Sequence, residues 1–249
     1  MTQPIVLVTG GSRGIGAACC LLAARRGYAV AVNYAANAQA ADQVVAQIAA
    51  GGGRAIAVQG DVAVEADVLA MFQAVDARLG RLNALVNNAG VVDYPGTVDA
   101  MSFARLRRMF DINVIGSFLC AREALLRMST RHGGAGGAIV NLSSAAARLG
   151  SPGQYVDYAA AKGAIDTFTK GLALEVADQG VRVNAVRPGI IDTDIHASGG
   201  LPDRVQQISP LVPMKRPGSA MEVAQAILWF LSAEASYCTG TIIDVAGGR

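Results

Sequence analysis

The sequence predicts a single-domain α/β fold over residues 1–249: a Rossmann-type, doubly wound parallel sheet of about seven strands with helices on both faces. Short, nearly uninterrupted runs of Val, Ile and Ala alternate with longer helical segments, which is typical of a parallel sheet buried on both faces. Hydrophobic residues make up 52% of the chain but aromatic residues only 5%, so small side chains dominate and helices can pack closely on a sheet. No repeat, low-complexity block or linker divides the sequence into two cores.

In the first half of the chain, each apolar strand is followed by a helical pattern. The expected strands are Ile5–Thr9, Ala29–Asn33, Ala55–Gln59 and Ala84–Asn87. The expected helices cover residues 14–26, 39–50 and 65–79, and they stop at Gly27, at the glycines 51–53 and at Gly80. Glycine commonly ends a helix because it adopts the left-handed backbone conformation without strain. The alternation therefore predicts right-handed strand–helix–strand crossovers.

The second half of the chain continues this alternation with longer helices. Strands are expected at Ala138–Leu142, Val181–Val186 and Thr241–Val245, and helices at about 102–131, 155–177 and 220–232. The least regular stretch, residues 192–213, holds the glycine pair 199–200 and three prolines. In a doubly wound sheet a long loop after the carboxyl end of a strand lies over the ligand crevice, so we expect a substrate lid here.

Composition and charge exclude several classes of protein. The 21 Lys and Arg against 19 Asp and Glu give a net charge of +2, which is too balanced for a nucleic-acid binder. The dense basic cluster Arg105, Arg107 and Arg108 is expected to be a solvated helix face. No apolar stretch reaches the ~18 residues of a membrane span, and the amino end lacks the basic region of a signal peptide. The four cysteines lack metal-ligand spacing, so we expect a cytoplasmic protein with reduced thiols and no metal, membrane or nucleic-acid partner.

A glycine-rich turn joins the first strand to the first helix. It reads Thr9-Gly10-Gly11-Ser12-Arg13-Gly14-Ile15-Gly16. Gly10 permits the tight turn, Gly14 allows the backbone to approach a phosphate, and Gly16 allows the helix to pack on the strand. A helix amino end also offers free N–H groups and a positive dipole end to an anion. The turn therefore predicts a pyrophosphate site for a dinucleotide.

The residues after the second strand bear on which dinucleotide binds. An acidic residue there would bind the ribose 2′-hydroxyl of NAD, but the sequence continues through Asn33 and Tyr34 with no acid before Asp42. Arg13, inside the glycine turn, could pair with a 2′-phosphate. Both observations favour NADP(H), with NAD(H) as the alternative.

Tyr158 and Lys162 are four residues apart on a predicted helix, so they share one face. A tyrosine with its ordinary pKa near ~10 is a poor acid or base at neutral pH, and a neighbouring ammonium lowers that pKa. Tyr158 could then exchange a proton with a substrate oxygen. Tyr155 is less suitable for this role because the residue four positions on is Ala159.

Further polar motifs follow in an order that matches a known family. They are Asn87-Asn88-Ala89-Gly90, Asp111-Ile112-Asn113-Val114, Asn141-Leu142-Ser143-Ser144, and Arg187-Pro188-Gly189 with Asp192-Thr193. Together with the glycine turn and the Tyr158–Lys162 pair, these motifs make the chain resemble the short-chain dehydrogenase/reductase family from Val8 to Gly248. The closer likeness is to 3-oxoacyl-[acyl-carrier-protein] reductases and glucose 1-dehydrogenase-like members.

The resemblance implies four catalytic residues. Tyr158 would be the acid/base, and Lys162 would lower its pKa while holding the nicotinamide ribose. Ser144 would orient the substrate oxygen, and Asn113 would anchor a water in a proton relay. Ser143 stays open as the alternative to Ser144, because Ser144 lies 14 residues before Tyr158, one more than is usual in the reductases. The implied cofactor-binding residues are Gly10, Ser12, Arg13, Gly14, Ile15, Gly16, Asn33, Tyr34, Asp61, Val62, Asn88, Ala89, Gly90, Tyr158, Lys162, Pro188, Gly189, Ile191 and Thr193.

The implied activity is reversible hydride transfer between nicotinamide and a carbonyl or secondary-alcohol substrate. If the protein is not an enzyme, the alternative is an NADP(H)-sensing binding protein. If it is an enzyme, the alternatives are a dedicated 3-oxoacyl-[acyl-carrier-protein] reductase and a glucose 1-dehydrogenase. Residues 192–213 and 148–157 are expected to set the substrate, with Asp93, Tyr94, His196 and Met214 within reach of it. The resemblance also implies a homotetramer in which the helices at about 102–131 and 155–177 pair between subunits.

Overall fold

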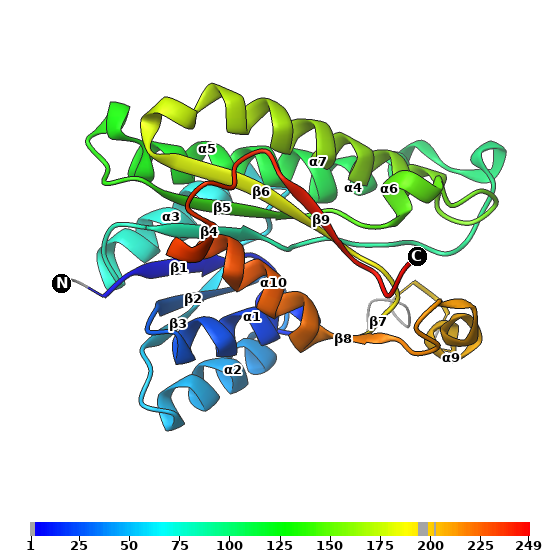
Figure 1. Ribbon diagram of the computed structural model, residues 1–249, viewed down its shortest axis with the longest axis horizontal. Coiled ribbons are helices and arrows are strands. Elements are labelled where there is room, and N and C mark those ends of the chain that lie inside the picture. Colours follow the sequence, from blue (N-terminus) through cyan, green and yellow to red (C-terminus); the bar gives the residue numbers. More distant parts are fainter. Residues whose placement is uncertain (1–2, 194–198, 202) are drawn as a thin grey trace.

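A seven-stranded parallel sheet forms the middle layer of the molecule (Figure 1). The computed structural model describes residues 3–193, 199–201 and 203–249. The sheet order is β3-β2-β1-β4-β5-β6-β9, from β1 (Ile5–Val8), β2 (Ala29–Tyr34), β3 (Ala55–Gln59), β4 (Ala84–Asn87), β5 (Gly137–Leu142), β6 (Val181–Pro188) and β9 (Ile242–Val245). The predicted doubly wound parallel sheet of about seven strands is therefore confirmed.

Helices cover both faces of the sheet (Figure 1). One face carries α1 (Gly14–Arg25), α2 (Ala38–Ala50) and α10 (Ala220–Leu231), and the other carries α3 (Glu65–Arg78), α5 (Gly116–Met128) and α7 (Val156–Glu175). Successive strand residues point into alternate cores: Val6 and Val8 into the first, Leu7 into the second. Burial on both faces explains why these strands read as uninterrupted apolar runs.

The direction of the strand order reverses at β1. β2 and β3 extend from one side of β1, and β4 to β9 extend from the other. Such a switch point leaves a crevice at the carboxyl ends of the two central strands. Here the backbone N–H of Thr9, just beyond β1, donates to the carbonyl of Val86 in β4 at 3.0 Å. The topology therefore brings the glycine turn and the residues that follow β4 to the same place.

The helix expected at about 102–131 is interrupted. α4 (Phe103–Phe110) runs into a π-helical turn over Asp111–Ile115, which leads directly into α5. A π-helical turn inserts an extra residue without ending the helix, so apolar spacing alone does not reveal it. α5 ends at Met128, and Thr130–His132 form a separate 3₁₀ turn.

The described part of residues 192–213 takes part in regular structure that the composition does not predict. β7 (Ile191–Asp192) pairs with β8 (Gly218–Ser219) in a second, two-stranded sheet, and α9 (Arg204–Ile208) lies between them in the chain. Figure 1 places these elements beside the carboxyl end of the chain. The short helix α6 (Ala146–Leu149) was also not predicted. His196, expected near the substrate, lies outside the described residues.

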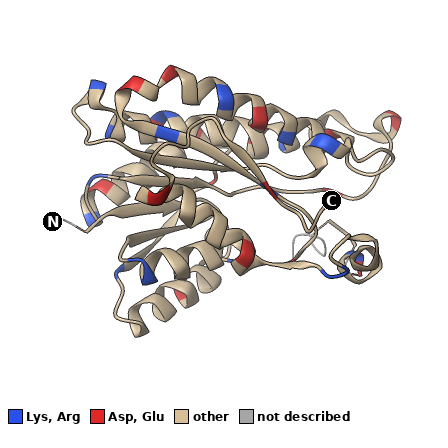
Figure 2. Cartoon of the chain, in the orientation of Figure 1, with Lys and Arg blue, Asp and Glu red and all other residues tan. Residues whose placement is uncertain are grey.

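Charged side chains of both signs are mixed over the helices and loops in the view of Figure 2. Among the described residues, no helix is both long and apolar enough to cross a membrane. The same part of the chain holds no cluster of three or more His, Cys, Asp or Glu side chains that could bind a metal ion.

Candidate active site

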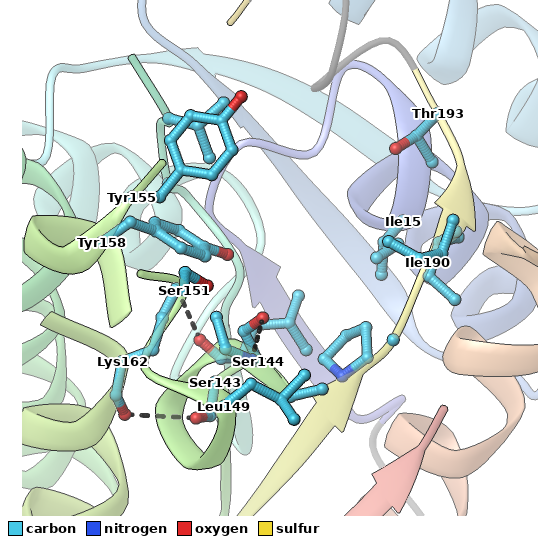
Figure 3. A pocket seen from close by; sticks show the side chains of 18 of the residues that line it. Ile15, Ser143, Ser144, Leu149, Ser151, Tyr155, Tyr158, Lys162, Ile190 and Thr193 are labelled. Atoms are coloured by element: carbon cyan, nitrogen blue, oxygen red, sulfur yellow. Dashed lines mark hydrogen bonds between the residues drawn. The ribbon is translucent and has the colours of Figure 1, made fainter. Parts of the chain in front are cut away.

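A cavity of about 160 Å³ lies at the carboxyl ends of the central strands, between the glycine turn and α7 (Figure 3). It brings together many of the predicted site residues from separate parts of the chain. Those that line it are Ile15, Asn88, Gly90, Ser143, Ser144, Tyr158, Lys162, Pro188, Gly189, Ile191 and Thr193. Tyr158 and Ser144 lie on one side of this cavity, and Ile15 and Thr193 on the other (Figure 3).

The glycine turn is held from both neighbouring strands. The side-chain oxygen of Asn33, at the end of β2, accepts from the backbone N–H of Gly10 at 3.0 Å. The side-chain amide of Asn88, just after β4, donates to the carbonyls of Thr9 at 2.8 Å and Gly10 at 3.0 Å. The Asn33 amide nitrogen also donates to the carbonyl of Gly60 at 2.9 Å, so both ends of this buried side chain hold neighbouring backbone in place.

Two glycines of the turn are required by geometry. Gly10 has a φ of +60°, a left-handed conformation that glycine adopts without strain. A Cβ on Gly16 would lie 2.3 Å from the carbonyl oxygen of Gly10 and 2.6 Å from the amide nitrogen of Asn88. Gly16 therefore allows α1 to lie close to the chain directly beyond β1 and β4, where Gly10 and Asn88 stand.

The amino end of α1 suits an anion. Arg13 occupies the N-cap position without a side-chain capping bond, and the first turn contains no acidic residue. The backbone N–H groups at such an end have no intrahelical acceptors, and the helix dipole favours negative charge there. Ser12 and Ile15 flank this end, and Thr193 approaches Gly14 from the segment after β6. The residues present therefore fit the pyrophosphate of a dinucleotide.

The predicted adenosine-side residues lie at or just beyond the ends of β2, β3 and β4. Asp61 accepts from the backbone N–H of Ala63 at 2.9 Å, which shapes the turn after β3. Val62 is buried against Gly116, where an added Cβ would lie 2.7 Å from a Val62 methyl carbon. Tyr34, at the end of β2, is half-buried. Ala89 is fixed by its backbone N–H, which donates to the Thr9 hydroxyl at 3.0 Å.

The segment after β6 forms the far wall of the cavity. Pro188 accepts from the backbone N–H of Ala145 at 3.0 Å, and Gly189 donates to Val245 at 3.0 Å. A Cβ on Gly189 would lie 2.7 Å from the Cα of Ala246, so the close approach of β9 requires glycine at this position. Ile191 is 4% exposed and anchors the start of β7.

The two adjacent serines have different surroundings. Ser143 is buried, and its hydroxyl donates to the carbonyl of Lys162 at 3.2 Å. Ser144 is half-buried, and its hydrogen bond with the Tyr158 hydroxyl lowers the pKa of that phenol. Ser144 therefore faces Tyr158 in the cavity, whereas Ser143 ties β5 to α7.

Burial dominates the ionisation of the Tyr158–Lys162 pair. It raises the pKa of Tyr158 to about 12, against the opposing effect of Ser144. It lowers the pKa of Lys162 to about 8, although the nearby Asp166 carboxylate acts in the opposite direction. The Lys162 amino group donates to the carbonyl of Leu142 at 2.7 Å and lies 5.6 Å from the centre of the Tyr158 ring. The net shift of the Tyr158 pKa is thus opposite to the direction expected from a neighbouring ammonium.

Asn113 lies in the π-helical turn, and its side chain is buried. Its oxygen accepts from the backbone N–H of Val91 at 3.1 Å, and its nitrogen donates to the carbonyls of Val91 and Met109, each at 3.0 Å. A Cβ on Gly90 would lie 2.7 Å from the Asn113 oxygen and 3.5 Å from the Lys162 nitrogen. Asn113 therefore fixes the chain after β4 against the cavity.

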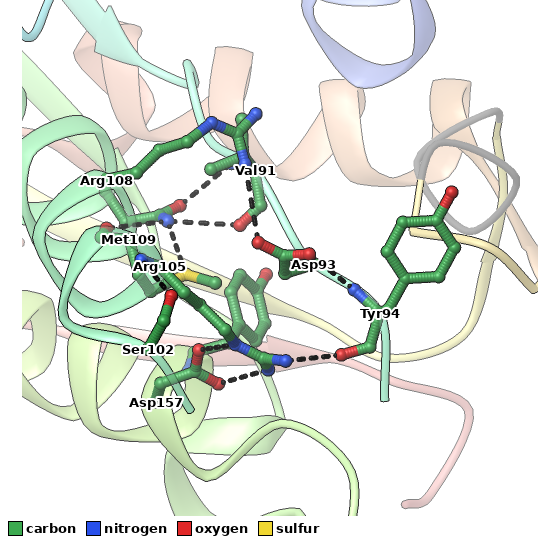
Figure 4. A network of polar contacts seen from close by, with 10 residues as sticks. Val91, Asp93, Tyr94, Ser102, Arg105, Arg108, Met109 and Asp157 are labelled. Carbon is green, nitrogen blue, oxygen red and sulfur yellow. Dashed lines mark hydrogen bonds and ion pairs between the residues drawn. The ribbon is translucent and has the colours of Figure 1, made fainter. Parts of the chain in front are cut away.

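The basic cluster on α4 is not a solvated face throughout (Figure 4). Arg105 is 14% exposed and binds both carboxylate oxygens of Asp157, at 2.7 and 3.1 Å. It also donates to the carbonyl of Tyr94 at 2.7 Å. Arg107 and Arg108 are more exposed and pair with carboxylates at 3.4 and 3.8 Å. The expectation is therefore wrong for Arg105, which joins α4 to the start of α7.

Comparisons with known proteins identify the family. The family model described as Enoyl-(Acyl carrier protein) reductase matches residues 10–249. A double phenylalanine-to-leucine variant of a Serratia marcescens short-chain dehydrogenase/reductase matches with a TM-score of 0.91 and 32% identity, covering 99% of this chain and 98% of that one. The chain belongs to the short-chain dehydrogenase/reductase family. It is therefore an oxidoreductase of a family that uses NAD(H) or NADP(H).

Relatives of this dehydrogenase/reductase match over nearly the whole chain. "Uncharacterized oxidoreductase YgfF" of Escherichia coli is 58% identical, covering 98% of this chain and 99% of that protein. "3-oxoacyl-[acyl-carrier-protein] reductase" of Synechocystis sp. is 40% identical, covering 100% and 97%. "Glucose 1-dehydrogenase 2" of Bacillus subtilis is 36% identical, covering 100% and 95%.

The cavity of this dehydrogenase/reductase also contains side chains that the motifs do not indicate. Tyr155, Ser151, Arg204 and Arg249 all line it. Tyr155 precedes Tyr158 by three residues, so helical spacing could have placed it near the site. Arg204 lies within residues 192–213, the stretch expected to cover the substrate, but no motif singles out this arginine.

Proposed function

We propose that this protein catalyses reversible hydride transfer between NADP(H) and a carbonyl or secondary-alcohol substrate, with Tyr158 as the acid/base. The observation that carries the proposal is the common cavity: Tyr158, Ser144 and Lys162 face it from one side, and the uncapped amino end of α1 adjoins it from the other. A bound nicotinamide would supply or accept the hydride, while the protein supplies orientation and a proton.

The side chains around Tyr158 are consistent with a protein that orients the substrate and supplies the proton. In the reducing direction the Ser144 and Tyr158 hydroxyls hold the substrate oxygen, a C–H bond forms at the carbonyl carbon, and the Tyr158 proton moves to that oxygen. Burial favours the protonated phenol, which is the form that reduction needs. Lys162, anchored on Leu142, sits where it can hold the nicotinamide ribose and assist return of the proton.

Asn113 completes the proposed relay in a specific way. Its side-chain atoms are bound to Val91 and Met109, so a relay water would contact its main-chain carbonyl. π-Helical turns within α-helices occur frequently at functional sites.

NADP(H) is proposed as the preferred cofactor, with NAD(H) as the weaker one. Arg13 lies exposed at the amino end of α1, where a guanidinium can bind a phosphate bidentately. The chain that follows β2 offers no carboxylate before Asp42, and the Asn33 amide is held within the glycine turn. We expect Arg13→Ala to weaken NADPH binding about tenfold and NADH binding by less than about twofold. Equal losses for both cofactors would contradict the preference.

Two further proposals concern assembly and location. The homotetramer is supported by apolar side chains exposed on α4 and α7, with Phe103 79% and Leu174 81% exposed in one chain. Light scattering on a sizing column should give four chains per particle, and a monomer would contradict the proposal.

We further propose a cytoplasmic location, consistent with four free cysteines, three of them buried.

The function is tested by following the absorbance of NADPH and NADH with a panel of carbonyl compounds. The panel contains simple ketones, aldoses and 3-oxoacyl thioesters, because relatives are named glucose 1-dehydrogenase and 3-oxoacyl-[acyl-carrier-protein] reductase. Turnover of at least one class, faster with NADPH, is expected. Tight NADPH binding without turnover of any member would favour a nucleotide-sensing role instead.

A further inference from the structure

Two guanidinium groups line the cavity that contains Tyr158. Arg204 opens the short helix α9, and Arg249 lies beyond β9. Both side chains are half-buried. Burial lowers the pKa of Arg204, and the charge of Arg249 lowers it further, whereas the Tyr155 hydroxyl opposes the shift. Two positive groups are thus held near each other in a site that must also admit a substrate.

Tyr155 holds Arg204 in place. The Arg204 guanidinium lies over the Tyr155 ring, 5.0 Å from its centre, and the Tyr155 side chain is almost fully buried. A guanidinium stacked on an aromatic face keeps its N–H donors free for a planar anion. Gly200 also lies against the ring of Tyr94, where an added Cβ would be 2.3 Å from a ring carbon. Arg204 therefore has a defined position.

Arg204 differs from Arg105 and Arg187, two other half-buried arginines of the described chain. Arg105 and Arg187 each bind a carboxylate at 2.7 Å. Within residues 3–193, 199–201 and 203–249, no carboxylate lies within 4.0 Å of Arg204. A half-buried charge without a counter-charge is costly unless a ligand supplies one.

The position of Tyr155 places this charge on the substrate side of the cavity. Figure 3 shows Tyr155 and Ser151 on the same side as Tyr158, and Ile15 and Thr193 across the cavity. The amino end of α1, which suits a pyrophosphate, adjoins Ile15. Arg204, whose guanidinium contacts Tyr155, is therefore placed with the Tyr158 side of the cavity.

We propose that the substrate carries an anionic group, a carboxylate or a phosphate, close to its reacting carbonyl, and that Arg204 binds that group on the Tyr155 ring. This inference rests on the proposed function. It names the substrate class: small oxo acids or oxo phosphates, and their hydroxy counterparts in the reverse direction. Tyr155 is then a positioning residue, and Arg249 adds to the positive potential.

The test compares matched substrate pairs that differ in one charge. Acetoacetate is paired with methyl acetoacetate, and dihydroxyacetone phosphate with dihydroxyacetone, each reduced with NADPH. We expect the anionic member of one pair to have the higher kcat/KM. A preference for acetoacetate would indicate a carboxylate substrate, and a preference for dihydroxyacetone phosphate would indicate a phosphate substrate. Arg204→Met should lower that kcat/KM about 10- to 100-fold, mainly through KM, and change the neutral member less than about threefold.

Three controls separate the explanations. Arg131→Met removes an exposed arginine outside the cavity and should change neither member of a pair. Arg204→Lys should retain part of the anion preference, since it keeps the charge and loses the planar fork. The Kd of NADPH, measured by fluorescence, should stay within about twofold in Arg204→Met.

Specific outcomes overturn the inference. They are a wild-type preference for the neutral members, equal losses for both members in Arg204→Met, or weakened NADPH binding in that variant. If both pairs are inert while other ketones are reduced, the anionic class is wrong and the proposed function stands. If no carbonyl compound is reduced at all, the proposed function fails, and titration of acetoacetate into the NADPH complex then decides whether the anion still binds.

Discussion

Replacing Gly16 by alanine tests the physical role assigned to the glycine turn. The added Cβ would lie 2.3 Å from the carbonyl oxygen of Gly10 and 2.6 Å from the side-chain nitrogen of Asn88. Neither neighbour can yield easily, because one is backbone and the other donates to two carbonyls of the same turn. The turn must therefore move if Gly16 gains a side chain.

The expected size follows from overpacking and helix propensity. Overpacking costs about 1–3 kcal/mol, and alanine recovers about 1 kcal/mol as a better helix former. The net loss is therefore up to about 2 kcal/mol, which would lower the Tm by up to roughly 8 °C for a chain of this length. Displacement of the turn should also raise the Kd of NADPH about tenfold or more, which corresponds to about 1.4 kcal/mol.

Gly171→Ala is the matched control. Gly171 lies in α7, and an added Cβ there would meet nothing within 4 Å. This variant should gain about 0.5–1 kcal/mol and bind NADPH unchanged. Thermal unfolding and NADPH fluorescence titration measure both quantities. The reasoning is refuted if Gly16→Ala equals Gly171→Ala in both Tm and Kd.

Three further predictions concern neighbouring groups. Ser144→Ala should lower kcat/KM about 100-fold and Ser143→Ala less than about fivefold, as measured by NADPH oxidation; the reverse order would reassign the serine. Arg105→Met should lower the free energy of unfolding in urea by about 3 kcal/mol, because it leaves the Asp157 carboxylate buried and unpaired. Adding Asp157→Asn to that variant should restore part of the lost stability. If the effects of the two substitutions simply add, the ion pair does not stabilise the fold in this way. Lys162 loses its proton at about pH 8 when folded and near pH 10.5 when unfolded. Between these two pH values the unfolded chain therefore binds more protons than the folded chain. The free energy of unfolding of the unsubstituted protein, minus that of Lys162→Met, should rise with pH in this range. A fall in this difference would contradict the argument that burial lowers the Lys162 pKa.

Local sequence signals account for much of the fold and of the site. The strands are predictable because burial on both faces leaves apolar runs such as Ile5–Val8. The glycine turn is predictable because its conformation and close contacts require residues without side chains. Tyr158 and Lys162 are predictable because four residues on a helix bring two side chains to one face.

Other features depend on contacts between distant segments. The Arg105–Asp157 pair joins residues 52 apart, and the contact of Arg204 with Tyr155 joins the start of α9 to the start of α7. The π-helical turn at Asn113 keeps the helical pattern, so apolar spacing does not reveal it. The rise in the Tyr158 pKa depends on burial by several elements, whereas spacing indicated only the neighbouring lysine.

Turnover by Tyr158→Phe tests the central claim most directly. The substitution removes one hydroxyl and keeps the ring, so the cavity and its proposed cofactor-binding wall should persist. We predict that NADPH oxidation with the best carbonyl substrate falls about 1,000-fold or more, while the Kd of NADPH stays within about twofold. Activity close to that of the unsubstituted enzyme would contradict the assignment of Tyr158 as the acid/base.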